Sequence, residues 1–277
     1  LQDEEHRFSV KNTQTKNGDK EMEKSLTYFA INNQKAAFGI ETTKNFPTHL
    51  RVYYQLLAIE GYLHQAGIKF KRNFEMNPNS VKKALESDII ISFADKISFD
   101  LSTIKDKIIH VPLSKDEIKK QFKSNNPLVG LIETKDYIKV QYGNRFMTKI
   151  YPAYFDYDLD TASFDFEIDG EVKNLKFGSI VNVKNYFKAV EKNGYRVNII
   201  GYVGKNESEH DVKISKKDLP NSYAIDKQNS MYRVEVYKDN KFSGMFVMDF
   251  SQKRTKSLNN NSSFICKLQQ DLNIKNN

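Results

Sequence analysis

The stretch that decides the fold of the N-terminal part runs from residue 36 to residue 51 and begins Ala36-Ala37-Phe38-Gly39-Ile40-Glu41. Its first five residues are apolar or small, which predicts a buried strand covered on both faces. The polar segment that follows predicts a loop, and a second helix is expected from Thr48. The pattern therefore predicts an α/β arrangement in which one carboxylate, Glu41, lies at the end of a strand.

Two interpretations of Glu41 follow from the residues alone. A carboxylate at the end of a covered strand is partly desolvated, which suits it to act as a general base near neutral pH. Alternatively, Glu41 caps the following loop or forms an ion pair with Lys44 or Arg51. A lone carboxylate is a weak signal, so the residue pattern by itself favours the second, structural interpretation.

A known family shares this order of elements. A helix, a strand reading Ala-Phe-Gly-Ile-Glu-Thr, a loop and a long helix resemble the end of the catalytic domain in zinc carboxypeptidases of the carboxypeptidase A type. With its β-rich downstream region, the chain is most similar to the cell-shape-determining peptidoglycan DL-carboxypeptidases of helical Gram-negative bacteria. The resemblance covers residues 1 to about 72 as catalytic-domain tail and, more loosely, the region to about 252.

The resemblance implies a function and a location. Glu41 would be the general base that activates a zinc-bound water, and the chain would be the C-terminal part of an enzyme that trims a terminal amino acid from muropeptides. Its partner would be a peptidoglycan peptide in the periplasm, and the signal peptide would lie upstream of Leu1. The alternative is a non-catalytic module that binds cell wall or a protein.

Zinc is expected in the intact protein but not in this chain alone. The family's metal ligands, a His-x-x-Glu or Gln-x-x-Glu pair and a third His, lie well before the glutamate, whereas Glu41 is close to the start of this chain. Gln2 and Glu5 match the pair, and His6 follows them, but we interpret this match as a coincidence. We therefore predict no metal ligand here and an inactive isolated chain. Leu1, in place of Met, is consistent with a chain that begins inside a longer protein.

The polar loop over residues 6–18 has a predicted role in substrate binding. The resemblance implies that this segment forms walls of the substrate pocket, where Asn12, Thr13 and Thr15 would hydrogen-bond a peptide amide or carboxylate. The alternative is that these are ordinary loop residues, since hydroxyl and amide side chains are common in any loop.

Composition limits the classes of protein. The 277 residues are 39% hydrophobic and 28% charged, which predicts a globular chain, and no apolar run is long enough to span a bilayer. The net charge of +8 favours an anionic partner, but no basic run interleaved with aromatic residues predicts a nucleic-acid platform. The single cysteine, Cys266, cannot form an internal disulfide. Oligomeric state has no signal in the sequence.

The pattern along the chain predicts four parts. Residues 1–73 form the catalytic-domain tail, with a helix capped by Asp19 and another from Thr48; residues 74–150 form a small β-rich domain that begins with a helix capped by Asn79 or Ser80. Residues 151–252 form a β-sandwich, with the immunoglobulin fold as one candidate and a hairpin turn at Asp169-Gly170. Residues 253–277 form a polar tail.

Overall fold

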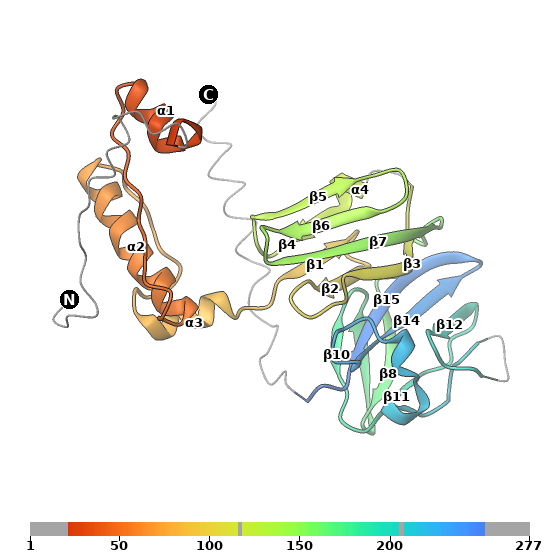
Figure 1. Ribbon diagram of the computed structural model, residues 1–277. Helices are drawn as coiled ribbons and strands as arrows, with labels where there is room; N and C mark the ends of the chain where they lie inside the picture. Colours follow the sequence, from red (N-terminus) through yellow and green to blue (C-terminus); the bar gives the residue numbers. More distant parts are fainter. Residues whose placement is uncertain (1–21, 116–117, 205–207, 253–277) are drawn as a thin grey trace. The chain divides into compact units, whose positions relative to one another are not determined.

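The chain divides into two compact units between Ser87 and Asp88 (Figure 1). The computed structural model describes residues 22–115, 118–204 and 208–252. The division falls within a few residues of the end of the helix that precedes it. None of the described helices combines the length and hydropathy needed to cross a bilayer.

The described part of the N-terminal unit contains helices only. A short 3-10 helix, Met22–Lys24, leads into α1 (Leu26–Asn32), and these are followed by α2 (Thr48–Gln65) and α3 (Pro78–Leu85). Asn77 caps α3, because its side chain accepts a hydrogen bond from the Ser80 backbone N–H at 2.8 Å. The helix predicted from Thr48 is confirmed, and Gly67 follows its end with a positive φ of 70°.

Three predictions for this unit are wrong. Residues 36–41 form no strand, because no described segment lies alongside them to complete a hydrogen-bonded ladder. The first helix is capped by Ser25, which accepts from the Tyr28 N–H at 3.1 Å, rather than by Asp19, which lies outside the described residues. Asn77, not Asn79 or Ser80, caps α3, since Pro78 at the first helical position places the cap one residue before it.

The second unit begins with two sheets. The first contains β1 (Ile90–Phe93), β2 (Ile97–Asp100) and β4 (Phe122–Ser124), with the short helix α4 (Ile118–Gln121) before β4. The second has the order β3-β7-β6-β5, formed by Lys107–Leu113, Phe146–Tyr154, Ile138–Tyr142 and Val129–Glu133. The β3–β7 pair is parallel, whereas β6 pairs with both neighbours antiparallel.

The remaining strands form two further sheets. One has the order β10-β15-β14-β12, from Ile180–Asn182, Lys241–Asp249, Met231–Lys238 and Tyr195–Ile199. The other has the order β13-β11-β8-β9, from Ile214–Ser215, Tyr186–Ala189, Ser163–Ile168 and Glu171–Lys176. The predicted hairpin is confirmed, since Asp169 and Gly170 join β8 to β9 with φ values of 53° and 96°.

The β14–β15 hairpin lies between two hydrophobic cores. One face of the hairpin contributes Tyr237, Phe242 and Met245 to a core shared with β1, β2 and β3. The other face contributes Tyr232, Val234 and Phe246 to a core shared with β8 and β11. Burial on both faces explains why nearly every residue of β14 and β15 is buried.

The observed packing bears on the predicted domains. The two cores meet at the β14–β15 hairpin, so the described residues from Asp88 to Gln252 form one compact unit. The last two sheets share one hydrophobic core, but an immunoglobulin-like arrangement is not confirmed, and β10 pairs parallel to β15. The residue limits of the predicted domains stay a prediction. The predicted tail, residues 253–277, lies outside the described residues.

Candidate active-site segment and its relatives

The segment that carries Glu41 lies along helix α2. The Phe38 ring stacks on Tyr62, with centroids 5.0 Å apart and an interplanar angle of 15°, and Phe46 packs against Tyr54 at 5.8 Å. Between these two anchors, the Thr42 hydroxyl accepts a hydrogen bond from Arg51 Nε at 3.4 Å. The segment is thus held at both ends by aromatic contacts, although it has no strand partner among the described residues.

Glu41 itself is exposed in this structure. The prediction that the Glu41 carboxylate is partly buried is therefore wrong for the described residues. Neighbouring strands and their side chains would be needed to cover it, and no sheet forms around this segment among the described residues. The alternative ion pairs are not observed either, because no ion pair joins Glu41 to Lys44 or Arg51 in the described part of the unit. The carboxylate is accessible to solvent.

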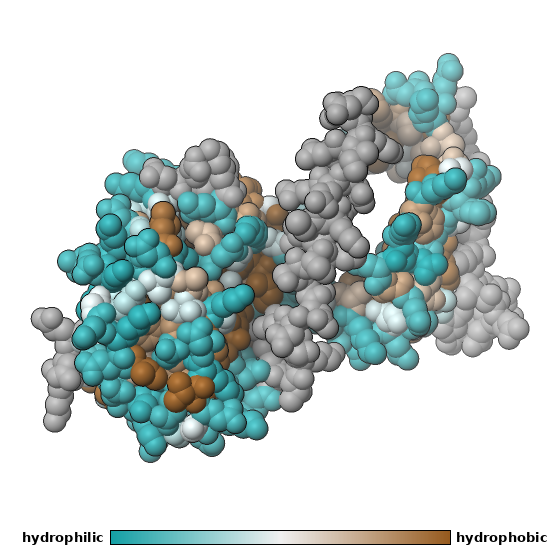
Figure 2. Space-filling model, turned by 180° about the vertical axis from the view of Figure 1, so that it is seen from behind, coloured by the Kyte–Doolittle hydropathy of each residue, from teal (hydrophilic) through white to brown (hydrophobic). Residues whose placement is uncertain are grey.

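Apolar side chains of helix α1 and of the Glu41 segment are also exposed. The exposed fractions are 81% for Leu26, 65% for Phe29 and 66% for Phe38, and Figure 2 shows hydrophobic residues on the visible surface of this unit. The prediction that the first helix packs its apolar face on a sheet containing residues 36–41 is therefore wrong here. In the described part of this unit, Val81 is the one fully buried apolar side chain.

The remaining predicted site residues cannot be placed. Asn12, Thr13 and Thr15 lie outside the described residues, as do Gln2, Glu5 and His6. Over residues 22–115, 118–204 and 208–252, no group of three or more His, Cys, Asp or Glu side chains has the geometry to hold a metal ion. The donor set of a zinc site is therefore not provided by the described side chains.

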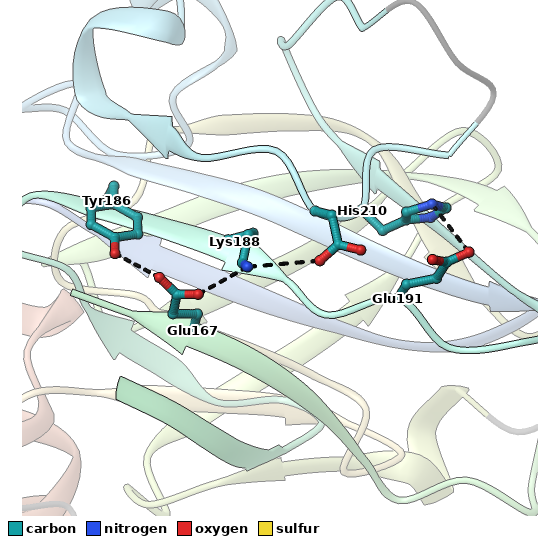
Figure 3. Close-up of polar contacts among 6 residues, drawn as sticks. Glu167, Tyr186, Lys188, Glu191 and His210 are labelled. Carbon is teal, nitrogen blue, oxygen red and sulfur yellow. Dashed lines mark hydrogen bonds and ion pairs between the residues drawn. The ribbon is translucent and has the colours of Figure 1, made fainter. Parts of the chain in front are cut away.

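A polar cluster in the second unit lies on the outer face of the β13-β11-β8-β9 sheet (Figure 3). Glu167 accepts a hydrogen bond from the Tyr186 hydroxyl at 2.6 Å and pairs with Lys188 Nζ at 2.9 Å. Those two partners, Tyr186 first and then Lys188, lower the pKa of Glu167, and the carboxylate in turn raises the pKa of Lys188. His210 Nε2 lies 3.6 Å from Glu191 Oε1 nearby.

This cluster is a surface network rather than a catalytic constellation. Glu167 faces the Tyr186 hydroxyl and Lys188, and Lys188 also lies 3.8 Å from Asp211 Oδ1, so these groups neutralise one another. The alternation in residues 163–168 places Glu167 on the polar face, but sequence alone did not indicate its partners. They come from β11, and strand pairing between distant segments has no local signal.

Comparison with known proteins identifies the class. Three family models match consecutive parts of the chain. They are described as the catalytic part of a carboxypeptidase controlling helical cell shape (residues 1–86), a β-barrel domain of carboxypeptidase M99 (86–156) and a C-terminal domain of metallo-carboxypeptidase (157–251). The chain thus contains, in order, a part matched by the catalytic model, a β-barrel domain and a C-terminal domain of the kind found in metallo-carboxypeptidases. It belongs to the M99 carboxypeptidase family, which confirms the resemblance found in the sequence.

Solved structures of Helicobacter pylori Csd4 are similar to this chain. The mDAP-bound form of Csd4, described as a D,L-carboxypeptidase, is 37% identical, with a TM-score of 0.64, over 87% of this chain and 59% of that one. The apo form matches with the same identity and TM-score over 86% and 58%, and the tripeptide-bound form with 37% and 0.63 over 87% and 58%. The chain thus spans less than two thirds of these relatives. No significant match was found among curated proteins.

Proposed function

We propose that this chain is the C-terminal part of a peptidoglycan D,L-carboxypeptidase that removes a terminal amino acid from muropeptides. The observation that carries the proposal is the unbroken order of catalytic, β-barrel and C-terminal M99 models over residues 1–251. The mDAP-bound and tripeptide-bound forms of Csd4 support a peptide ending in mDAP as the substrate. Because the polymer lies in the periplasm of Gram-negative cells, we place the enzyme there.

Glu41 is the proposed general base. It is an accessible carboxylate within the matched catalytic region, on a segment held against α2 by Phe38 and Phe46. In this role Glu41 takes a proton from the attacking water and passes it to the leaving amine as the peptide bond breaks. Asn12, Thr13 and Thr15 are the proposed contacts to the peptide. General-base catalysis of this kind contributes about 10²–10⁴ in rate.

Zinc is the metal that we propose for the intact enzyme. The family description as a metallo-carboxypeptidase supports a metal requirement. The described side chains offer no suitable ligand set, so the metal ligands must come from other residues. The non-catalytic scaffold is the less favoured alternative, because the match to the catalytic model includes the Glu41 segment.

The test is hydrolysis of a muropeptide tripeptide ending in mDAP by the protein that contains this chain, with release of mDAP measured by chromatography. We expect Glu41→Gln to lower turnover by at least about 100-fold while the zinc content stays unchanged. Glu75→Gln, an exposed glutamate of the same unit, is the matched control and should retain full turnover. Turnover that survives Glu41→Gln would refute the role of Glu41. A wild-type protein that binds cell wall but releases no mDAP would support the scaffold.

A further inference from the structure

Three lysines lie side by side on the outer face of the β3-β7-β6-β5 sheet. The strand register places Lys107 beside Lys149, and Lys149 opposite Lys139. Neighbouring strands are about 4.8 Å apart, so the three side chains form one row across the sheet. Their neighbours along the strands, Ile108, Ile150 and Val140, are buried, which directs the lysines to the outside.

Among the described residues, the three lysines of the row have no acidic partner. In the part of the chain that the structure describes, no ion pair joins any of the three lysines to a carboxylate. The carboxylate adjacent in sequence to Lys107, that of Asp106, is paired with Lys227 at 2.8 Å. Like charges directly opposite each other destabilise a sheet. The row of lysines therefore destabilises the folded state, and a bound anionic ligand would offset this repulsion.

Two tyrosines hold the row in place. The rings of Tyr137 and Tyr151 lie 5.5 Å apart, between centroids. Lys149 Nζ lies 4.9 Å from the centre of the Tyr137 ring, and Lys107 Nζ lies 4.8 Å from that of Tyr151. These cation–π contacts keep two ammonium groups close to the sheet and beside flat aromatic surface.

The same face continues into a hollow beside the turn that joins β6 to β7. Gln141 and Met147, which are opposite each other in register, line it next to the lysine row, and Arg145 adds a further cation. Met147 is 39% exposed and Ile132, opposite Lys139, is 52% exposed, so apolar surface alternates with charge. From Tyr137 to Gln141 the face extends about 13 Å at the usual rise of a strand.

We propose that this face, the lysine–tyrosine strip (Tyr137, Lys139, Lys149, Tyr151 and Lys107), binds the peptidoglycan polymer itself. The inference rests on the proposed function for the identity of the polymer. Free carboxylates on the peptide stems complement the three ammonium groups, and the sugar rings of the glycan present flat faces to the tyrosines. The β-barrel region thereby holds the enzyme on its polymeric substrate, separately from the recognition of the terminal residue that is cut.

The test is co-sedimentation of the 277-residue chain with purified insoluble peptidoglycan at low salt. We expect Lys139→Glu/Lys149→Glu to weaken binding at least tenfold and Lys139→Gln/Lys149→Gln to weaken it severalfold. The control, Lys217→Glu/Lys241→Glu, makes the same change in net charge at exposed lysines elsewhere and should bind within twofold of wild type. Amidation of the carboxylates of the polymer should abolish binding by the wild-type chain. Thermal unfolding checks that each variant is folded.

Several outcomes would overturn the inference. Equal binding by the strip and control variants would show that only net charge matters. Tighter binding of anionic lipid vesicles or of DNA than of peptidoglycan would assign the strip to another ligand. Binding that survives amidation would show that the strip does not recognise the carboxylates of the polymer. The assay involves no hydrolysis, so its failure leaves the carboxypeptidase proposal intact. Conversely, a chain that binds through the strip but belongs to an inactive protein would refute only the proposed enzyme.

Discussion

Arg233 Nη1 lies 3.6 Å from Glu235 Oε1 on β14, and the two side chains are only 6% and 4% exposed. Arg233 also donates to the His110 carbonyl of β3 at 3.1 Å, and the Tyr237 hydroxyl donates to Glu235 Oε2 at 2.8 Å. Arg233 Nε and Glu235 Oε1 make no hydrogen bond. This buried pair therefore links a β-barrel strand to the C-terminal sheet, at a large desolvation cost.

The first prediction concerns removal of this pair. Arg233→Met leaves a buried carboxylate without its cation and should lower the free energy of unfolding by about 3–5 kcal/mol. The double variant Arg233→Met/Glu235→Leu removes both charges and should be close to wild type, or more stable by about 1–4 kcal/mol. Urea unfolding measures both. A double variant as unstable as Arg233→Met would show that the link to His110, not the charge, matters.

The second prediction is a pH dependence from Glu235. Burial raises the pKa of Glu235, and the opposing effects of Arg233 and Tyr237 do not cancel it. The folded protein therefore binds this proton more tightly than the unfolded chain, whose glutamate pKa is about 4.3. The stabilisation is complete below that value and is lost as pH rises through the folded pKa.

Glu235→Gln should remove this contribution. Other groups titrate with either sign, so the informative quantity is the difference in unfolding free energy between the variant and wild type, measured from about pH 4 to about pH 8. We expect the unfolding free energy of the variant to increase relative to that of wild type as pH rises. Parallel profiles for the two proteins would contradict the raised pKa.

The third prediction concerns Asp169, at the turn between β8 and β9. Its carboxylate accepts backbone hydrogen bonds from Lys184, Asn185 and Tyr186 at 2.9, 2.6 and 3.1 Å. Burial alone would raise the pKa of Asp169, but these bonds lower it below the usual value. Its stabilisation is therefore present above the unfolded pKa and is lost as pH falls through the folded pKa.

Asp169→Asn keeps the side-chain shape but leaves one oxygen to serve three donors. We expect a loss of about 1–3 kcal/mol at neutral pH that shrinks in acid. The matched control is Asp239→Asn, another aspartate with positive φ in a hairpin turn, but an exposed one. Chemical unfolding at two pH values measures both variants, and equal effects at the two positions would refute the role of the three bonds.

The fourth prediction concerns Gly244 in β15. A Cβ atom there would lie 2.1 Å from Cγ of Phe177, whose ring packs against the strand. Gly244→Ala should therefore displace Phe177 and lower the free energy of unfolding by about 1–3 kcal/mol. Gly130→Ala on β5, where the nearest atom is a carbonyl oxygen at 4.0 Å, is the control. Equal stability of the two variants would mean that Phe177 can move without cost.

Local signals predicted the elements that depend only on neighbouring residues. The helix from Thr48 and the hairpin at Asp169-Gly170 are confirmed, because helical periodicity and positive-φ turn residues act within a few positions. Apolar runs and alternation also predict strands over residues 88–93, 107–111, 128–133, 136–142, 231–237 and 242–250, and the structure has β1, β3, β5, β6, β14 and β15 there. The strands β2, β4, β7, β10 and β11 were missed; β4 and β10 have only three residues each, too few to show a period.

The sequence by itself determined the family, the order of a helical segment before β-rich regions, and Glu41 as a candidate base, because these depend on which residues occur and in what order. Only the tertiary structure decided that β14 and β15 serve two cores at once, and that Lys107, Lys139 and Lys149 share one row. Strand pairing joins residues far apart in the chain, and register is fixed by the burial of whole sheet faces rather than by any short motif. The exposed Glu41 shows the same dependence, since a strand forms only when its neighbours are present.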